Sequence, residues 1–264
     1  MSLPPLRRLS GPRATGADIV CFPYAGGGPS VFRQWPDALS AAGTVRAAHL
    51  AGREGRFHVP PTTDLKEQVT ELTRAVAVLA PDRPLVLYGH SLGATLAAHV
   101  AQEVFPSRSA PSLLVVAARV PPWADPAPFP TDERPTEAWT DDEVLASFRW
   151  AGGIDSALSH DRELREVVMP VLRADAMLAG DRQYLGERAV DSPVLALYGT
   201  DDPIADAERT ASWRRFTTGD FTHAPVSGGH LFVNTHGTQV TARVAKALGR
   251  LTGPFDSDRG DAPG

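Results

Sequence analysis

The sequence predicts an α/β protein in which a mostly parallel sheet is covered by helices on both faces. Two observations lead to this prediction. Short apolar runs of strand length alternate with segments of helical spacing along most of the 264 residues. One of these runs, at 85–88, passes through Gly-His-Ser-Leu-Gly at 89–93 into an Ala-rich segment of helical spacing that extends to 104. The length suits a single domain of this class that carries an insertion.

Composition excludes several classes of function. Hydrophobic residues make up 42% of the chain and charged residues 22%, which is typical of a globule with a sizeable core. The net charge of −5 gives no indication of nucleic-acid binding, and no apolar run approaches the length of a membrane span. The single cysteine, Cys21, excludes an internal disulfide and is expected to pack as a small hydrophobe. One cysteine suits a reducing compartment, so we expect a cytoplasmic protein. No Cys/His cluster has metal-ligand spacing, so we expect no metal.

The elements before the serine motif alternate between strand and helix. Residues 1–15 are rich in Pro, Arg and Gly without periodicity, and we expect them to form a flexible arm. Strands are predicted at 18–22 and 45–50. Asp64 then caps a helix whose apolar residues are spaced by four, three and four positions, namely Leu65, Val69, Leu72 and Val76.

The segment 121–188 interrupts this alternation. A strand at 113–118 precedes it, but the segment itself has no strand pattern, dense proline at its start, and helical spacing at 164–172. Pro170 lies inside that helical stripe and predicts a break or kink near Met169. A helical insertion between two strands of such a sheet predicts a lid over the C-terminal ends of the strands, within one domain that spans the chain.

The alternation resumes after the insertion. Strands are predicted at 192–198 and 221–226, with a capped helix at 206–215 between them and a helix at 231–251 after them. The tail at 252–264 is polar and rich in Gly and Pro, and we expect it to be flexible.

Ser91 is the candidate nucleophile, because it is the central residue of a G-x-S-x-G turn between a predicted strand and a predicted helix. A serine on so tight a turn has strained backbone geometry, and a side chain at Gly89 or Gly93 would collide with the neighbouring strand or helix. The turn places the Ser91 hydroxyl at a helix N-terminus, where backbone N–H groups face developing negative charge. The alternative is a glycine-bracketed turn that carries an ordinary serine.

Two glycine-rich loops follow predicted strands in the first part of the chain. The loop at 23–28 contains three consecutive glycines, so a backbone N–H can approach a substrate closely, and its position favours one half of an oxyanion hole. A flexible turn is the alternative, and a phosphate-binding loop would need a Gly-Lys-Ser/Thr that is missing here. The loop at 51–56 carries Arg53 and Arg56, a composition typical of a solvated turn.

A serine hydroxyl needs a base to remove its proton as it attacks. Of the eight histidines, His230 follows the last predicted strand on a Gly-Gly loop, where a sheet of this kind places its base, although a solvated loop residue is the alternative. His90 adjoins the serine, but the turn directs its side chain away. Asp201 and Asp202 follow the penultimate strand, which gives the order Ser, Asp, His of nucleophile-elbow enzymes. We prefer Asp202, because the proline after it restricts its backbone, and keep Asp201 as the alternative.

Seven stretches of the chain together carry a family resemblance, at 21–27, 52–56, 89–93, 119–122, 170–175, 199–203 and 228–232. They resemble the type II thioesterases that accompany polyketide and nonribosomal peptide synthases, within the α/β-hydrolase superfamily. The Phe-Pro-Tyr-Ala-Gly-Gly and Pro-x-Leu-Arg-Ala-Asp stretches are the specific ones, whereas the serine motif is shared across the superfamily. The chain departs from the family pattern at Ala51, where proline is usual, which affects the shape of that loop and not the catalytic set.

The resemblance implies an α/β-hydrolase fold and a serine thioesterase. Carried over residue by residue, it makes Ser91 the nucleophile, His230 the base and Asp202 its orienting partner, with the backbone N–H groups of Ala25 and Leu92 as the oxyanion hole. The implied substrates are aberrant or stalled acyl groups on the phosphopantetheine thiol of acyl or peptidyl carrier proteins. The hydrolysis that it implies needs no cofactor.

Three other functions remain open at this point. A general carboxylesterase would share the triad, a product-releasing thioesterase would share the chemistry, and a non-catalytic carrier-binding protein would have no need of all three triad positions. We expect a monomer whose partner is a carrier protein, with neither nucleic acid nor membrane. Positive charge in the insertion could include a docking patch for an acidic carrier, at Arg149, Arg162, Arg165, Arg173, Arg182 and Arg188.

Overall fold

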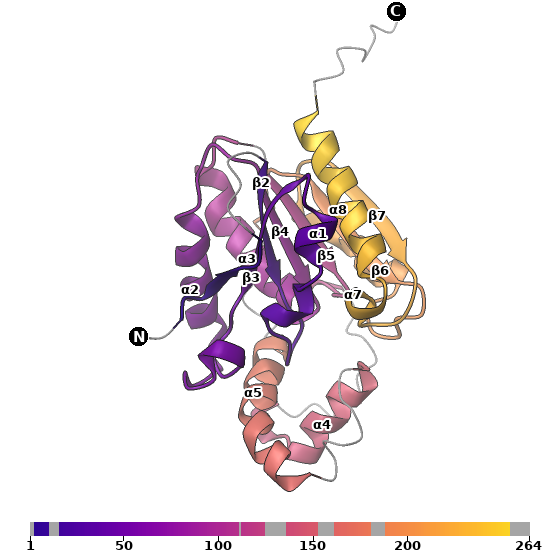
Figure 1. The fold of residues 1–264 in the computed structure, drawn as a ribbon. Coiled ribbons are helices and arrows are strands. Elements are labelled where there is room, and N and C mark those ends of the chain that lie inside the picture. Colours follow the sequence, from indigo (N-terminus) through magenta and orange to yellow (C-terminus); the bar gives the residue numbers. More distant parts are fainter. Residues whose placement is uncertain are drawn as a thin grey trace, which may run out of the picture.

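A seven-stranded sheet forms the centre of the protein, with the strand order β1-β3-β2-β4-β5-β6-β7 (Figure 1). The computed structural model describes residues 3–10, 16–110, 112–124, 136–152, 161–180 and 188–253. All neighbouring strands are parallel except β1, which pairs antiparallel with β3. The mostly parallel sheet predicted from the sequence is therefore confirmed. The strands are β1 (Leu6–Arg8), β2 (Ala17–Phe22), β3 (Gly43–Ala48), β4 (Leu85–His90), β5 (Ser112–Ala117), β6 (Val194–Gly199) and β7 (Phe221–Val226).

Helices cover both faces of this sheet, and alternate residues of its central strands face two separate cores. One core lies under α2 and α3 and contains Val20, Phe22, Leu85 and Leu87, whereas the other lies under α1 and α8 and contains Ile19, Cys21, Val86 and Tyr88. The buried Cys21 is thus a packed hydrophobe, and burial raises the pKa of its thiol. The helices are α1 (Trp35–Ala38), α2 (Leu65–Ala77), α3 (Leu92–Val104), α4 (Asp141–Trp150), α5 (Arg162–Gly180), α6 (Ala207–Ala211), α7 (Phe232–Thr235) and α8 (Gly237–Thr252).

The N-terminal segment differs from the expectation of a flexible arm over residues 1–15. Within it, Leu6–Arg8 forms β1, which pairs with residues 46–48 of β3 and adds a strand at the edge of the sheet. The hydrogen-bonding partner that orders this short strand comes from β3, so the local sequence carries no signal for it. At the other end, α8 extends to Thr252, and residues 254–264 lie outside the described part.

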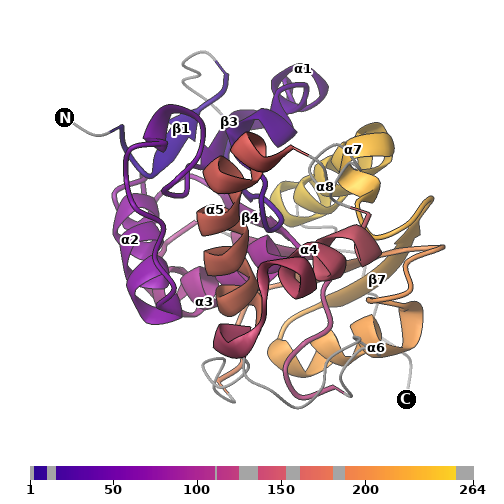
Figure 2. The same cartoon turned by 90° about the horizontal axis from the view of Figure 1, so that it is seen from below.

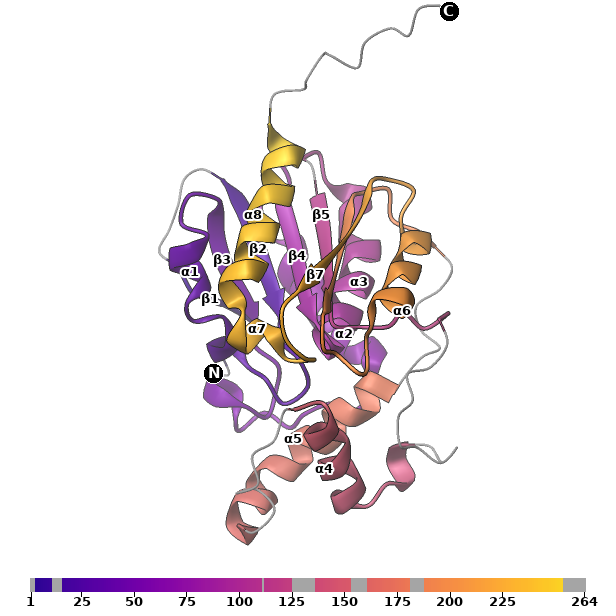
Figure 3. The ribbon, with the colours of Figure 1, turned by 90° about the vertical axis from the view of Figure 1, so that its right-hand side faces the viewer.

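The insertion predicted at 121–188 is helical in its described part, which contains the 3₁₀ turn η4 (Thr136–Ala138), α4 and α5. Figures 2 and 3 show α4 and α5 together at one end of the sheet. This is the end at which the parallel strands terminate, because the N–H of Gly26, in the loop after β2, donates a hydrogen bond to Asp175 on α5. α5 runs without interruption through Pro170, so the helix does not break near Met169, and the alternative of a kink there stays a prediction. The two helices share a small cluster of buried residues, Val144, Leu145, Phe148, Met169, Leu172 and Ala176.

The C-terminal helices are more divided than the sequence predicts. The helix expected at 206–215 starts as α6, capped by the Asp206 side chain, and continues as the 3₁₀ turn η6 (Ser212–Phe216). The helix expected at 231–251 is split at His236 into α7 and α8, because the His236 backbone (φ −126°, ψ 33°) leaves the helical range. Of the helices in the described residues, none combines the length and apolar character needed to cross a bilayer.

Candidate active site

The G-x-S-x-G turn joins β4 to α3, and Ser91 lies at its centre with a positive φ of 54° and a ψ of −117°. Such a backbone is rare for a residue with a side chain and is held in place by the packing around it. A Cβ at Gly89 would clash with the backbone of Gly93 and Ala94, and one at Gly93 would clash with the carbonyl groups of Phe22 and Pro23. Both glycines are therefore required for α3 to start this close to β4 and to the end of β2.

Ser91, His230 and Asp202 form one chain of hydrogen bonds although they come from three separate loops. The Ser91 Oγ lies 3.0 Å from His230 Nε2, and His230 Nδ1 lies 2.9 Å from Asp202 Oδ2 and 3.1 Å from Oδ1. Because a carboxylate only accepts hydrogen bonds, Nδ1 carries the proton, and Nε2 is left to accept from the serine hydroxyl. The His230 and Asp202 side chains are 5% and 0% exposed, so water does not compete for these bonds.

Of the two adjacent aspartates, the structure brings Asp202 to His230 and leaves Asp201 exposed. The Asp202 Oδ1 also accepts from the backbone N–H groups of Ile204 at 2.8 Å and Ala205 at 3.1 Å. Burial alone would raise the pKa of the Asp202 carboxyl, but the hydrogen bond and charge of His230, together with these two N–H groups, lower that pKa below 3.8. Asp202 is therefore an anion with a fixed orientation.

The position of His90 in the turn excluded it as the base, and its side chain forms hydrogen bonds to groups other than Ser91. Its Nε2 lies 2.7 Å from the backbone carbonyl oxygen of His230 and its Nδ1 lies 3.1 Å from the Tyr88 hydroxyl. Since a carbonyl only accepts, Nε2 carries the proton and Nδ1 accepts from Tyr88. Burial first, and His230 second, lower the pKa of His90 to about 3. A neutral, buried imidazole thus holds the backbone of the candidate base, a contact that adjacency in sequence did not reveal.

The two amides predicted for the oxyanion hole lie on elements that pack against one another. Leu92 is the first residue of α3, and the first N–H groups of a helix have no acceptor within it. In the loop after β2, the Gly26 N–H donates to Asp175 and the Gly27 N–H donates to the Tyr24 carbonyl, whereas the described contacts give the Ala25 N–H no acceptor. The oxyanion hole formed by these two N–H groups stays a prediction, and both groups are available as donors among the described contacts.

Arg53 and Arg56 are both buried, so the prediction of a solvated turn at 51–56 is wrong. Arg53 forms a two-pronged ion pair with Asp175 of α5, with N–O distances of 2.7 and 2.8 Å. Arg56 pairs instead with Glu71 of α2 and donates to the carbonyl of His49 at 2.6 Å. Neither partner is near in sequence, and burial of a guanidinium requires such partners.

The arginines considered for carrier docking are largely committed within the molecule. Arg162 pairs with Glu166, Arg165 with Asp142, and Arg173 with Asp141, and Arg188 reaches both the carbonyl of Gln102 and the carboxylate of Glu103. Arg149 has a partner as well, and Arg182 lies outside the described residues. The described arginines of this set thus have partners within the molecule, although Arg162 and Arg188 stay largely exposed.

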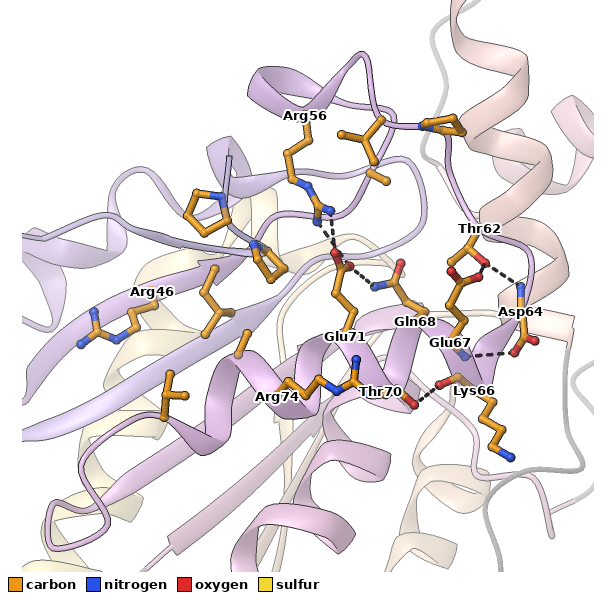
Figure 4. A pocket seen from close by; sticks show the side chains of 18 of the residues that line it. Arg46, Arg56, Thr62, Asp64, Lys66, Glu67, Gln68, Thr70, Glu71 and Arg74 are labelled. Atoms are coloured by element: carbon orange, nitrogen blue, oxygen red, sulfur yellow. Dashed lines mark hydrogen bonds and ion pairs between the residues drawn. The ribbon is translucent and has the colours of Figure 1, made fainter. Parts of the chain in front are cut away.

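A groove of about 1050 Å³ lies on the β1 edge of the sheet, between β1, the turn η2 (Glu54–Arg56) and α2, and Ser91 is not among its lining residues. Figure 4 shows several of its polar side chains paired with one another: Glu71 lies between Arg56 and Gln68, and the Thr62 hydroxyl bonds to the Glu67 carboxylate and to the Asp64 backbone N–H. Five basic and three acidic side chains line the groove, and none of them belongs to the candidate triad.

Comparison with known proteins identifies the family. A sequence model of the thioesterase domain matches residues 17–248. Thioesterase PikA5 of Streptomyces venezuelae is 30% identical over 230 residues, which cover 87% of this chain and 80% of PikA5. A probable cadicidin biosynthesis thioesterase of Streptomyces griseus is 28% identical over 243 residues, which cover 92% of this chain and 65% of the relative, just under two thirds of its length.

Solved structures agree with this result. The type II thioesterase BorB of the borrelidin biosynthetic cluster matches with a TM-score of 0.79 and 28% identity, over 94% of this chain and 99% of BorB. The resemblance to type II thioesterases and the α/β-hydrolase fold, both expected from the sequence, are thereby confirmed. The chain belongs to the thioesterase family.

Proposed function

We propose that this protein is a type II, editing thioesterase that hydrolyses aberrant or stalled short acyl groups from the phosphopantetheine thiol of acyl or peptidyl carrier proteins. The observation that carries the proposal is the hydrogen-bonded chain from Ser91 through His230 to Asp202 in a member of the thioesterase family. The pathways of its relatives support the substrate class, since BorB is a type II thioesterase of a biosynthetic cluster. We further propose a monomer that acts in the cytoplasm.

In the proposed acylation step, the Ser91 Oγ attacks the thioester carbonyl carbon while His230 Nε2 takes the hydroxyl proton. The carbonyl oxygen becomes an oxyanion that the Ala25 and Leu92 N–H groups stabilise. The C–S bond then breaks, His230 returns the proton to the pantetheine thiolate, and the acyl group remains as an ester on Ser91. Asp202 holds the His230 tautomer throughout.

Deacylation repeats the same chemistry with water as the nucleophile. His230 removes a proton from water, the hydroxide adds to the ester carbon, and the second oxyanion occupies the same two N–H groups. The ester C–O bond breaks, Ser91 recovers its proton from His230, and the carboxylic acid leaves. Every proton is carried by groups of this chain, so the reaction requires no cofactor. We propose α4 and α5 as the lid that limits bulk water at this site.

A series of three substrates with the same acyl group tests the proposal. Propionyl on a carrier protein, propionyl-coenzyme A and a plain aryl propionate are compared by kcat/KM at low salt, with Ser91→Ala as the inactive control. We expect the carrier-bound group to exceed the coenzyme A thioester by at least about tenfold, or about 1.4 kcal/mol. Equal values for both thioesters, with faster turnover of the aryl ester, would favour a general carboxylesterase instead.

A further inference from the structure

The buried ion pair between Arg53 and Asp175 connects two loops to the insertion and has no part in the proton transfers above. Asp175 lies on α5 and is 1% exposed, and Arg53 follows β3 and is 8% exposed. Both carboxylate oxygens bind the guanidinium, at 2.7 and 2.8 Å, and the Arg53 Nε donates to the Ala51 carbonyl at 3.1 Å. A pair that is this deeply buried is costly to desolvate and by itself gives little stability. Its other contacts point to what it does.

Those contacts reach the loop that carries Ala25. Asp175 Oδ2 accepts from the Gly26 N–H at 2.6 Å, and the Arg53 guanidinium donates to the Gly27 carbonyl at 3.1 Å. The Gly27 N–H in turn donates to the Tyr24 carbonyl at 2.9 Å. That carbonyl belongs to the same planar peptide unit as the Ala25 N–H, so its orientation also sets the direction in which the Ala25 N–H points.

Packing against α5 ties the same loop to the insertion. Gly26 has a φ of +81°, and a Cβ there would lie 3.1 Å from Leu172 Cδ2. Gly52, in the Arg53 loop, has a φ of +80°, and a Cβ there would lie 2.8 Å from Val171 Cγ2. One turn of α5 thus touches both loops, with Asp175 at its end. A shift of α5 would move the acceptor of the Gly26 N–H and the partner of Arg53 together.

We propose that Arg53 and Asp175 are positioning residues that aim the Ala25 N–H at the oxyanion, and that the oxyanion hole is complete only when α5 is seated on the two loops. This inference rests on the proposed function. Removal of one oxyanion donor costs on the order of 10²–10³ in kcat, so misdirection of one donor should cost about 10- to 100-fold. The loss should fall on kcat and leave KM within about twofold, because the interaction is made in the transition state.

The test uses Asp175→Asn and Arg53→Lys in the full chain, with propionyl-coenzyme A as substrate and trifluoroacetonyl-coenzyme A as a reversible inhibitor. Ser91 adds to the ketone carbon of this inhibitor, His230 takes the proton, and the resulting oxyanion needs the same two N–H groups. We expect the inhibition constant to rise by the same factor by which kcat/KM falls. Active sites are counted with a serine-directed phosphonate, so that all rates refer to folded enzyme.

Glu71→Gln is the matched control, because it removes the charge that pairs with Arg56. Arg56 lies in the same loop as Arg53, but its contacts are with the His49 carbonyl and with α2 and not with the loop that carries Ala25. We expect its inhibition constant to stay within about twofold of the wild type. If Asp175→Asn yields too little folded protein, the double variant Arg53→Met with Asp175→Leu supplies an apolar pair that restores packing without restoring an acceptor for Gly26. It should be folded, with a raised inhibition constant.

Two outcomes separate this inference from the proposed function. If the wild type hydrolyses propionyl-coenzyme A and the Asp175 and Arg53 variants keep its inhibition constant per titrated site, the pair is only structural and the inference is overturned. If the wild type hydrolyses no thioester at all, the proposed function is the one that fails. A parallel rise of the inhibition constant and fall of kcat, absent in Glu71→Gln, supports the positioning role.

Discussion

Replacement of His90 by glutamine tests whether the buried imidazole next to Ser91 is neutral. Burial lowers the pKa of His90 from 6.5 to about 3 in the folded protein. Between these values the unfolded chain binds a proton at His90 and the folded protein does not. The contribution of His90 to stability is therefore complete above pH 6.5 and is lost as the pH falls toward 3.

The size of this effect follows from the two pKa values. The free energy of unfolding changes by about 1.4 kcal/mol per pH unit inside the window, so between pH 7 and pH 5 His90 should cost the wild type about 2 kcal/mol. Glutamine has no proton to gain, and its amide N–H can still donate to the His230 carbonyl. We expect His90→Gln to lack these 2 kcal/mol of pH dependence.

Urea unfolding at pH 7 and pH 5, followed by tryptophan fluorescence, measures the difference, because Trp213 is fully buried and reports on the fold. His58→Gln, a change at an exposed histidine, is the control and should show the pH dependence of the wild type. If the wild type and His90→Gln lose the same free energy of unfolding between the two pH values, His90 is not held neutral by burial and our account of this contact is wrong.

Three further predictions concern the candidate site. Ser91→Ala should lower kcat by about 10⁶ and abolish the single adduct that a serine-directed phosphonate forms, as measured by intact mass; an adduct that persists would remove Ser91 as nucleophile. Asp202→Asn should lower kcat by about 10⁴ through the wrong tautomer of His230, and Asp201→Asn should cost less than about tenfold; a reversed order of these effects would make Asp201 the partner. Gly93→Ala should lower the free energy of unfolding by about 3 kcal/mol or more in urea titrations, because its methyl group meets backbone atoms that cannot move; an unchanged value would contradict the clash.

The sequence was sufficient for the parts of the fold that depend on local pattern. The apolar run at 85–88 that begins β4, the strand at 221–226 and the helix capped by Asp64 each have a pattern that a short window contains. The turn around Ser91 could be predicted because the G-x-S-x-G pattern is local, although Gly93 is required by the carbonyl groups of Phe22 and Pro23 at the end of β2. The approach of Asp202 to His230 was expected from the order of the elements in the chain, and their catalytic roles remain predictions.

What the sequence did not reveal depends on partners far along the chain. Arg53 and Asp175 are 122 positions apart, so neither residue alone distinguishes a buried ion pair from a solvated turn. The short strand β1 is ordered by β3, and α5 continues through Pro170 because a helix of 19 residues can lose one backbone hydrogen bond and keep its packing. In each case tertiary contacts decide against the local signal.

The small apolar cluster between α4 and α5 has a consequence for how the packing of the insertion could be altered. Its buried side chains are shared by two helices alone, whereas α3 and β4 are packed on all sides within the cores of the sheet. Phe148 and Leu172 of this cluster lie next to Gly26, the residue after Ala25, and belong to neither core of the sheet. Exchanging volume between these two positions would change how α5 sits on the loop that carries Gly26, while the packing of α3 and β4 in the cores of the sheet stays as it is. The packing of the insertion can thus change separately from the packing that holds Ser91 in place.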